Sequence, residues 1–201
     1  MRLVAVTQRV DIYPSRGERR DALDQSWVRL LAACGLVALP MPNHAATART
    51  MFEEMPLTGL LLTGGNDLAR YGGDAPERDE TERLLLQLSR ARRLPVLGVC
   101  RGMQVIQDAF GVPQAAIPGH IAVRHRLDSR MHGVEVNSFH AYGATETVAD
   151  LEVLARAPDG IVEAVRHRSE PILGQMWHPE RESPYDAGDL SRIRSHFGVA
   201  S

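Results

Sequence analysis

The chain has 201 residues, of which 44% are hydrophobic and 24% charged, so it is long enough to bury one sizeable core, and we expect a single domain over residues 1–201. Its formal net charge of −2 provides no general attraction for nucleic acid or for an anionic membrane, and neither is expected as a partner. All 23 basic residues are arginine, so the absence of lysine excludes P-loop and Schiff-base lysine chemistry.

The first half of the chain alternates apolar β-type runs with helical patterns. The first predicted helix buries Leu23, Trp27 and Leu30 on one face, and Cys34 continues that face as a core residue. This alternation predicts a mostly parallel sheet covered by helices on both faces, with the functional site outside the carboxyl ends of the strands. The predicted strands cover residues 2–7, 36–39, 59–63 and 96–99, and the helices cover residues 21–34, 45–55, 77–93 and a stretch after residue 100.

The pattern changes after Gly111, where short strands follow one another with few helical patterns between them. The second half is therefore expected to be rich in β-hairpins, and neither a linker nor a repeat divides the chain. The predicted strands cover residues 121–127, 133–138, 151–157, 161–166 and 172–177, and a closing helix covers residues 189–197.

The N-terminal segment and the cysteines bear on location. The first apolar run has only five residues, too short for a signal-peptide core or a membrane span, so a cytoplasmic location is predicted. The two cysteines, Cys34 and Cys100, do not constitute a disulfide framework.

Cys100 lies in the motif G-V-C-R-G-M-Q, residues 98–104, between a predicted strand and a predicted helix. A nucleophile on such a tight turn requires small residues two positions before and after it, and Gly98 and Gly102 meet that demand. The helix N-terminus favours a thiolate, and the amide of Arg101 can point at a developing oxyanion. Read alone, the motif is equally compatible with a buried core cysteine.

Two further motifs supply the groups that a cysteine nucleophile needs. In G-Q-M-W-H-P-E, residues 174–180, His178 and Glu180 are two positions apart in extended backbone and project to the same side, as a base and its orienter. In T-G-G-N-D, residues 63–67, the amide of Gly65 can complete an oxyanion hole. Each motif alone also fits an ordinary strand end or turn.

With V-N-S-F-H at 136–140 and A-P-D-G-I-V-E-A-V at 157–165, these motifs resemble the class I glutamine amidotransferases, in the γ-glutamyl-γ-aminobutyrate hydrolase branch. The resemblance implies a flavodoxin-like three-layer α/β sandwich with a central, mostly parallel sheet and a β-rich C-terminal part. It implies cleavage of a γ-glutamyl amide through a thioester, with release of glutamate and without a cofactor. The implied residues are the nucleophile Cys100, the general base and acid His178, its orienter Glu180, the oxyanion hole Gly65 and Arg101, and the substrate-binding Gly64, Gln104, Asn137, Ser138 and His140.

An arginine-rich segment bears on the leaving group. It is expected to form a loop after the first strand, beside the site, and it carries Arg9, Arg16, Arg19 and Arg20. Arginine clusters suit phosphate, and this compact form of the chain resembles the γ-glutamyl-CDP-amidate hydrolases. That resemblance implies that Arg9 binds substrate and that the product is cytidine diphosphoramidate for capsular polysaccharide modification. The alternative is a solvated charged face.

Several readings stay open beside this one. The chain can be a hydrolase of another γ-glutamyl amine, a glutaminase subunit that passes ammonia to a synthetase, or a binding module, and a homodimer is compatible with the sequence. Three departures from the hydrolase branch, at Thr63, at Ala141-Tyr142 and in the short length of the chain, concern the leaving-group side more than the catalytic residues. No metal site is predicted, because no metal-ligand spacing appears among the neighbouring histidines His120, His125, His132 and His140. Surface or loop positions are expected for His120, His125, His132 and His167, and His120 and His125 can instead border the substrate pocket.

Overall fold

The computed structural model describes residues 2–129 and 135–199, in which five helices accompany one large sheet and three small two-stranded sheets. The helices are α1 (Gln25–Ala33), α2 (Ala45–Glu54), α3 (Pro76–Ala91), α4 (Arg101–Ala109) and α5 (Ala187–His196). The large sheet contains β1 (Arg2–Thr7), β4 (Leu36–Met41), β5 (Leu57–Leu62), β6 (Val96–Val99), β9 (Asp128–Ser129), β12 (Leu151–Arg156), β13 (Val162–His167) and β14 (Ile172–Gln175). The small sheets pair β2 (Arg9–Tyr13) with β3 (Glu18–Ala22), β8 (Ile121–Arg126) with β10 (Glu135–Phe139), and β7 (Ala115–Ala116) with β11 (Tyr142–Gly143).

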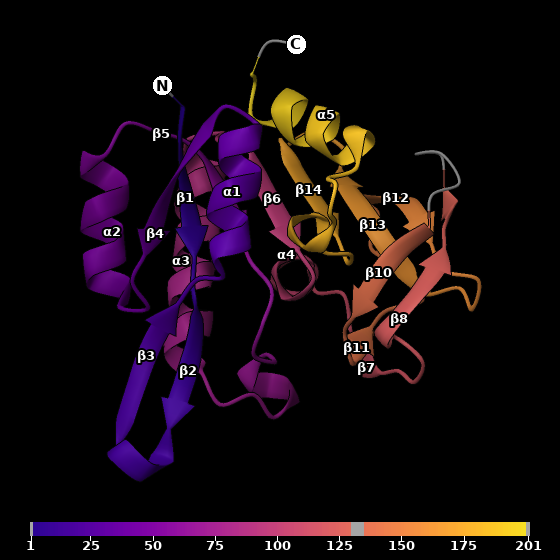
Figure 1. Ribbon diagram of the computed structural model, residues 1–201, viewed down its shortest axis with the longest axis horizontal. Coiled ribbons are helices and arrows are strands. Elements are labelled where there is room, and N and C mark those ends of the chain that lie inside the picture. The colour runs from indigo at the N-terminus through magenta and orange to yellow at the C-terminus, as the bar shows by residue number, and fades with distance from the viewer. Residues whose placement is uncertain (1, 130–134, 200–201) are drawn as a thin grey trace.

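The large sheet changes character along its width. Its strand order is β4-β1-β5-β6-β14-β13-β12-β9 (Figure 1). The pairs from β4 to β14 are parallel, whereas those from β14 to β9 are antiparallel. The predicted α/β fold, with a central, mostly parallel sheet and a β-rich C-terminal part, is confirmed.

Helices cover both faces of the sheet, which gives the predicted three layers. On one face α1 and α5 bury Trp27 and Phe197 in a common apolar cluster with β1 and β6. On the other face Phe52 of α2, Leu85 of α3 and Ile106 of α4 join a second cluster. The apolar stripe predicted for α1 is therefore in the core, and Cys34 is buried beside it.

The carboxyl ends of β1, β5 and β6 meet at one edge of the sheet, where the parallel register brings Thr7, Thr63 and Cys100 close in space. The Thr63 amide donates to the Thr7 hydroxyl over 3.0 Å, and the Thr63 hydroxyl donates to the Thr7 carbonyl oxygen over 2.8 Å. These bonds fix the start of the T-G-G-N-D loop at the edge where the sequence places the site.

The arginine-rich segment differs from the prediction, because residues 9–22 form the β2–β3 hairpin and not a loop. The hairpin projects from the carboxyl edge of the sheet in Figure 1, with Gly17 at φ +63° in its turn. The first helix consequently begins at Gln25 and not at Asp21. The Asp24 carboxylate caps it by accepting a 2.9 Å hydrogen bond from the Ser26 amide.

Most other differences are shifts of one or two residues at element ends. β4 continues through Pro40 to Met41, which a strand at the sheet edge tolerates because it needs no amide donor on its outer side. The predicted strand 133–138 corresponds to β10, and its residues 133–134 lie outside the described part of the chain, as does His132. Within the described ranges, no helix is both long and apolar enough to cross a membrane.

Candidate active site

Cys100 occupies a strained turn between β6 and α4. Its φ of 53° and ψ of −111° are rare for a residue with a side chain and cost about 1–3 kcal/mol. A methyl group at Gly98 would lie 2.5 Å from the Gly102 carbonyl oxygen, and one at Gly102 would lie 2.0 Å from the Leu62 carbonyl oxygen. The turn therefore requires glycine two residues before and two residues after the cysteine.

The backbone of Cys100 is anchored on both sides. Its amide donates to the Gln175 carbonyl oxygen over 2.8 Å, and its carbonyl oxygen accepts from the Gln104 amide over 3.1 Å. Cys100 is only 6% exposed and directly precedes α4, so it lies at the positive end of that helix's dipole. The geometry suits a nucleophile reached through a narrow opening.

His178 and Glu180 form the base side of the site. The Nδ1 atom of His178 lies 2.6 Å from Glu180 Oε1, and both side chains are buried. A methyl group at Gly64 would lie 3.5 Å from Cys100 Cβ and 3.5 Å from His178 Nε2. The imidazole and the cysteine thus meet over Gly64, and His178 Nε2 has no hydrogen-bond partner among the described residues.

The charges around His178 keep it protonated. Burial lowers the pKa of the imidazole, but the sulfur of Cys100 and the carboxylate of Glu180 raise it more, and the resulting pKa is about 9. At neutral pH the ring is therefore an imidazolium beside the cysteine.

Asn137 of β10 holds the backbone of His178. Its Oδ1 accepts from the His178 amide, and its Nδ2 donates to the His178 carbonyl oxygen, each over 2.9 Å. The same Nδ2 donates to Glu182 over 2.7 Å. Phe139, two residues further along β10, packs edge-on against the imidazole with ring centroids 5.8 Å apart.

Arg78 shapes the T-G-G-N-D loop from beneath. It is fully buried and donates to the carbonyl oxygens of Thr63, Gly64 and Gly65. The N–H and C=O groups of a trans peptide point in opposite directions, so the amides of Gly64 and Gly65 turn away from Arg78. Both glycines line the pocket and Arg78 does not, which leaves these amides on the pocket side.

Four buried charges connect this loop to the nucleophile turn. Arg78 pairs with Glu82 over 2.9 Å, and Arg101 pairs with Glu82 and Asp79. Burial lowers the pKa of Arg78 to about 10, which leaves it charged at neutral pH. Burial raises the pKa of Glu82, but Arg101 and Arg78 lower it more, so this carboxylate is ionised. The network joins the two segments whose amides are predicted to form the oxyanion hole.

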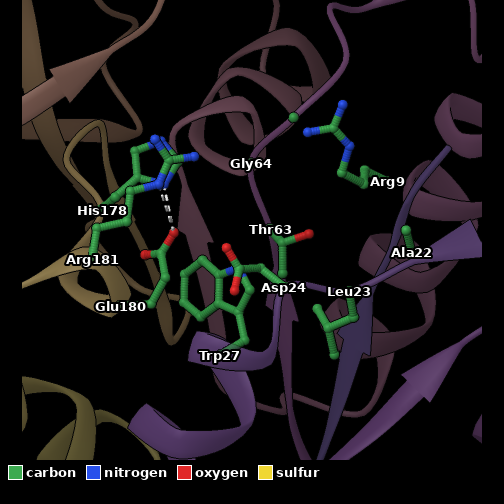
Figure 2. Close-up of a pocket in the computed structure, with 11 residues that line it drawn as sticks. Arg9, Ala22, Leu23, Asp24, Trp27, Thr63, Gly64, His178, Glu180 and Arg181 are labelled. Atoms are coloured by element: carbon green, nitrogen blue, oxygen red, sulfur yellow. Dashed lines mark hydrogen bonds and ion pairs between the residues drawn. The ribbon is translucent and has the colours of Figure 1, made fainter. Parts of the chain in front are cut away.

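A pocket opens at this edge of the sheet between two arginines. In Figure 2, Arg9 lies on one side of Gly64, and His178 and Arg181 lie on the other. The Arg9 side chain is 50% exposed and contacts Asp11 over 2.7 Å. Arg181 is 41% exposed, stacks over the Phe139 ring at 4.4 Å, and lies 3.7 Å from Glu180.

Of the arginines predicted to gather beside the site, Arg9 alone lines this pocket. Arg19 bonds to Glu77, and Arg20 bonds to Glu18 and stacks on Tyr13, while Arg16 lies in the hairpin turn. The sequence analysis did not predict Arg181 as a pocket residue. The available signal was its position directly after Glu180, which places it close to His178.

The remaining predicted substrate residues have their side chains engaged inside the protein. Gln104 donates to the Tyr142 carbonyl oxygen over 3.0 Å, and Ser138 donates to the His120 carbonyl oxygen over 2.8 Å. His140 contacts the Tyr142 carbonyl oxygen and Glu163. Their predicted contacts with a γ-glutamyl group, like that of Asn137, stay predictions. The predicted pocket border, His120 and His125, contacts Glu163 and does not line the pocket described above.

Comparison with known proteins identifies a matching family and relatives that are γ-glutamyl amide hydrolases. The family model for class-I glutamine amidotransferases matches residues 20–189. A γ-glutamyl-CDP-amidate hydrolase from Campylobacter jejuni is 30% identical over 183 residues, which cover 90% of each chain. A γ-glutamyl-γ-aminobutyrate hydrolase from Escherichia coli O157:H7 is 29% identical and aligns with 89% of this chain and 85% of its own length.

The fold has a counterpart among solved structures. A protein from Thermoplasma acidophilum, assigned as a GMP synthase subunit, superposes with a TM-score of 0.74. The superposition covers 99% of this chain and 94% of that one at 18% sequence identity. At this identity the likeness concerns the architecture, which agrees with the layers and strand order described above.

Proposed function

The chain belongs to the class I glutamine amidotransferases, and on that basis we propose that it hydrolyses a γ-glutamyl amide through the triad Cys100, His178 and Glu180. The observation that carries the proposal is the meeting of the strained Cys100 turn with an imidazole whose other nitrogen lies 2.6 Å from a buried carboxylate. A cysteine, a base and an orienting acid in this relation are the parts of a thiol acyl-transfer site.

The first half of the reaction transfers the glutamyl group to sulfur. The Cys100 thiolate attacks the γ-carbonyl carbon, and the negative oxygen that develops accepts hydrogen bonds from the amides of Gly65 and Arg101. The carbon–nitrogen bond then breaks, and the leaving amine takes the proton held on His178 Nε2. The products are a glutamyl thioester and the free amine.

The second half regenerates the enzyme. Neutral His178 removes a proton from water as the water oxygen attacks the thioester carbon, and Glu180 stabilises the imidazolium that forms. The sulfur leaves as the thiolate, glutamate is released, and His178 again carries a proton. Every proton transfer in the cycle thus uses the one imidazole nitrogen of His178 that has no partner among the described residues.

The substrate we propose is γ-glutamyl-CDP-amidate, so that the leaving group is cytidine diphosphoramidate. This choice is supported by the Campylobacter jejuni relative and by the two arginines, Arg9 and Arg181, at the pocket mouth. Arginine binds phosphate oxygens through two parallel N–H groups, and a hydrogen bond to a charged group is worth about 1.5–3 kcal/mol. A small uncharged amine offers these side chains no such contact.

The test offers the purified protein γ-glutamyl-CDP-amidate, γ-glutamyl-γ-aminobutyrate and glutamine side by side, with glutamate release as the measurement. We expect the nucleotide substrate to have the highest kcat/KM. Arg9→Ala and Arg181→Ala should each lower kcat/KM for that substrate by about 10–100-fold and change the rate with glutamine little. The loss with γ-glutamyl-γ-aminobutyrate should be smaller than with the nucleotide, because its leaving group carries one carboxylate in place of a diphosphate. Fastest turnover of glutamine or of γ-glutamyl-γ-aminobutyrate would overturn the nucleotide assignment.

Arg20→Ala is the matched control, because Arg20 comes from the same arginine-rich segment but pairs with Glu18 on the hairpin. It should leave all three rates unchanged. An equal loss from Arg9→Ala and Arg20→Ala would point to the general charge of the hairpin and contradict a phosphate contact at Arg9.

A further inference from the structure

A second group of polar side chains lies buried in the antiparallel half of the molecule, apart from the triad. Glu163 of β13 is inaccessible to solvent and has three histidines around it. Its Oε1 lies 3.3 Å from His120 Nδ1 and 3.2 Å from His140 Nε2, and its Oε2 lies 3.7 Å from His125 Nε2. The proposed reaction uses none of these groups.

The atoms that face one another inside this cluster have no hydrogen-bond partner among the described residues: His120 Nδ1, His125 Nε2 and Glu163 Oε2. Leaving a buried polar atom unpaired costs about 1–3 kcal/mol, so three that converge on one point require an explanation. Each residue offers one ligand atom, and these atoms lie within 4.8 Å of one another. A ligand that can bind all three atoms at once would satisfy them.

The outward contacts of two rings decide where their protons sit. His120 Nε2 lies 2.9 Å from the Asp159 carboxylate, and His140 Nδ1 lies 3.0 Å from the Tyr142 carbonyl oxygen. Both partners only accept hydrogen bonds, so each of these nitrogens carries the proton of its ring. A neutral imidazole then presents a lone pair inward, against the Glu163 carboxylate. Lone pairs and a carboxylate facing one another repel unless a proton or a metal cation lies between them, and a metal ion can satisfy two imidazoles and the carboxylate at once.

We propose that His120, His125 and Glu163 bind one divalent transition-metal ion, and that zinc suits the site best. Zinc binds imidazole nitrogen and carboxylate oxygen at about 2.0–2.2 Å, so neighbouring ligands of a tetrahedron stand about 3.3–3.5 Å apart. The distance from His120 Nδ1 to Glu163 Oε1 is 3.3 Å and that from His125 Nε2 to Glu163 Oε2 is 3.7 Å, both close to that spacing. The whole set of ligand atoms, within 4.8 Å, would have to contract by about 1.5 Å at most to close on one ion. The Asp159 carboxylate on the far nitrogen of His120 is the support that metal-bound histidines characteristically have.

The proposed metal joins segments that support the catalytic histidine. The His120 carbonyl oxygen accepts from the Ser138 hydroxyl over 2.8 Å and from the His140 amide over 3.0 Å, so it is tied to β10. On the other side, the Glu163 carbonyl oxygen accepts from the Met176 amide, two residues before His178. The ion would therefore have a structural role. Through His120 it would hold β10, which carries Asn137, and through Glu163 of β13 it would hold the segment at Met176, which leads to His178.

The sequence did not reveal this site because the ligands come from separate elements. His120 and His125 are five residues apart around β8, and the third ligand comes from β13. No short motif contains all three residues.

The experiment uses the full chain, dialysed against a chelator and titrated with Co²⁺ and then Zn²⁺. We expect one Co²⁺ per chain with the intense visible absorption of a four-coordinate ion, which Zn²⁺ displaces. His125→Gln should weaken Co²⁺ binding by more than about 100-fold, and Asp159→Asn by about 10–100-fold. His44→Gln is the control, because His44 caps α2 and lies outside the cluster.

A second readout separates binding from folding. Since His125 Nε2 makes no hydrogen bond among the described residues and only a 3.7 Å contact with Glu163, metal-free His125→Gln should melt within a few degrees of the metal-free parent chain. Excess Zn²⁺ should raise the melting temperature of the parent chain and of His44→Gln, and not that of His125→Gln. Absence of tight Co²⁺ binding to the parent chain, or equal binding by His125→Gln, would overturn the proposal and leave a cluster of protonated histidines.

Discussion

The two sides of the catalytic pocket are held in place by different forces. On the nucleophile side, buried charges fix the loop of Gly64 and Gly65 and the turn of Cys100, through Arg78, Arg101 and their carboxylate partners. On the base side, the Asn137 amide clamps the backbone of His178 with hydrogen bonds, two of them to uncharged groups. Both sides use buried polar groups, but ion pairs hold the loop and the turn on the nucleophile side, whereas hydrogen bonds of Asn137 hold the backbone of His178.

This difference affects how much stability each side contributes and how far apart in the sequence its contacting residues lie. Removing one member of a buried ion pair costs about 3–5 kcal/mol, because the partner stays buried and charged. Removing a neutral hydrogen-bonding partner costs about 1–3 kcal/mol. The buried charges come from two segments, residues 78–82 and residue 101, with Arg101 22 residues from Asp79, whereas Asn137 and His178 are 41 residues apart. The contacts on the nucleophile side therefore span shorter stretches of sequence, and breaking them is expected to cost more.

Cys100→Ala tests the nucleophile side most severely. Removing the sulfur leaves no atom to form the thioester, so glutamate release should fall by about four orders of magnitude or more. Cys34→Ala is the matched control, because Cys34 lies in the core beside α1 and should leave the rate unchanged. Full activity in Cys100→Ala would remove the basis of the proposed chemistry.

Arg78→Met should cause the largest loss of stability. It leaves three loop carbonyl oxygens without their donor and Glu82 without one of its partners, so the free energy of unfolding should fall by about 3–5 kcal/mol in denaturant titrations. Arg83→Met, on the exposed side of the same helix, loses only a 3.7 Å contact with Asp79 and should cost less than about 1 kcal/mol. Equal costs would show that the buried charges do not hold the loop.

Glu180→Gln should move the alkaline limb of the pH profile. His178 carries its proton below a pKa of about 9 and loses it above, so activity that needs the imidazolium should fall as the pH rises through about 9. Without the carboxylate the pKa of His178 falls, and the limb should move to lower pH. The rate at neutral pH should drop by about 10–100-fold. An unshifted limb in kcat/KM profiles would mean that Glu180 does not act on His178.

Asn137→Ala should have a smaller effect and distinguishes two roles for this residue. If the amide only positions His178, kcat should fall by about 10-fold while KM stays nearly constant, and stability should drop by about 1–3 kcal/mol. A raised KM with unchanged kcat would instead support the substrate contact implied by family resemblance. Asn43→Ala, which removes an amide bonded to Gln8 and Asp21, is the control.

Local patterns predicted much of the fold and supplied the residues of the proposed triad, whose roles stay predictions. Gly98 and Gly102 each lie two positions from Cys100, so the crowding that requires them is visible in the sequence. The apolar stripe of α1 is local in the same way. The β2–β3 hairpin was not predicted, because β2 has only two alternating aliphatic residues, Val10 and Ile12, and β3 is almost entirely charged.

The features that sequence reasoning missed depend on contacts between distant segments. Arg78 reads as one more charge on a helix, and only the fold brings its guanidinium beneath the T-G-G-N-D loop. Arg181 reads as a surface residue until the pocket is seen to open beside it. Glu163 sits inside an apolar strand pattern, and its three histidines come from other elements. In each case the order of the strands and the packing of the helices bring the interacting residues together, and neither is visible in the local sequence.

The central claim is that Cys100 forms a covalent bond to a glutamyl carbon. It can be tested by treating the protein with a γ-diazoketone analogue of glutamine and mapping the modified peptides by mass spectrometry. Burial raises the pKa of Cys34, which makes that thiol a poor nucleophile and an internal reference. The account predicts one label per chain, on Cys100, with loss of activity in proportion. Labelling of Cys34, or inactivation without modification of Cys100, would contradict it.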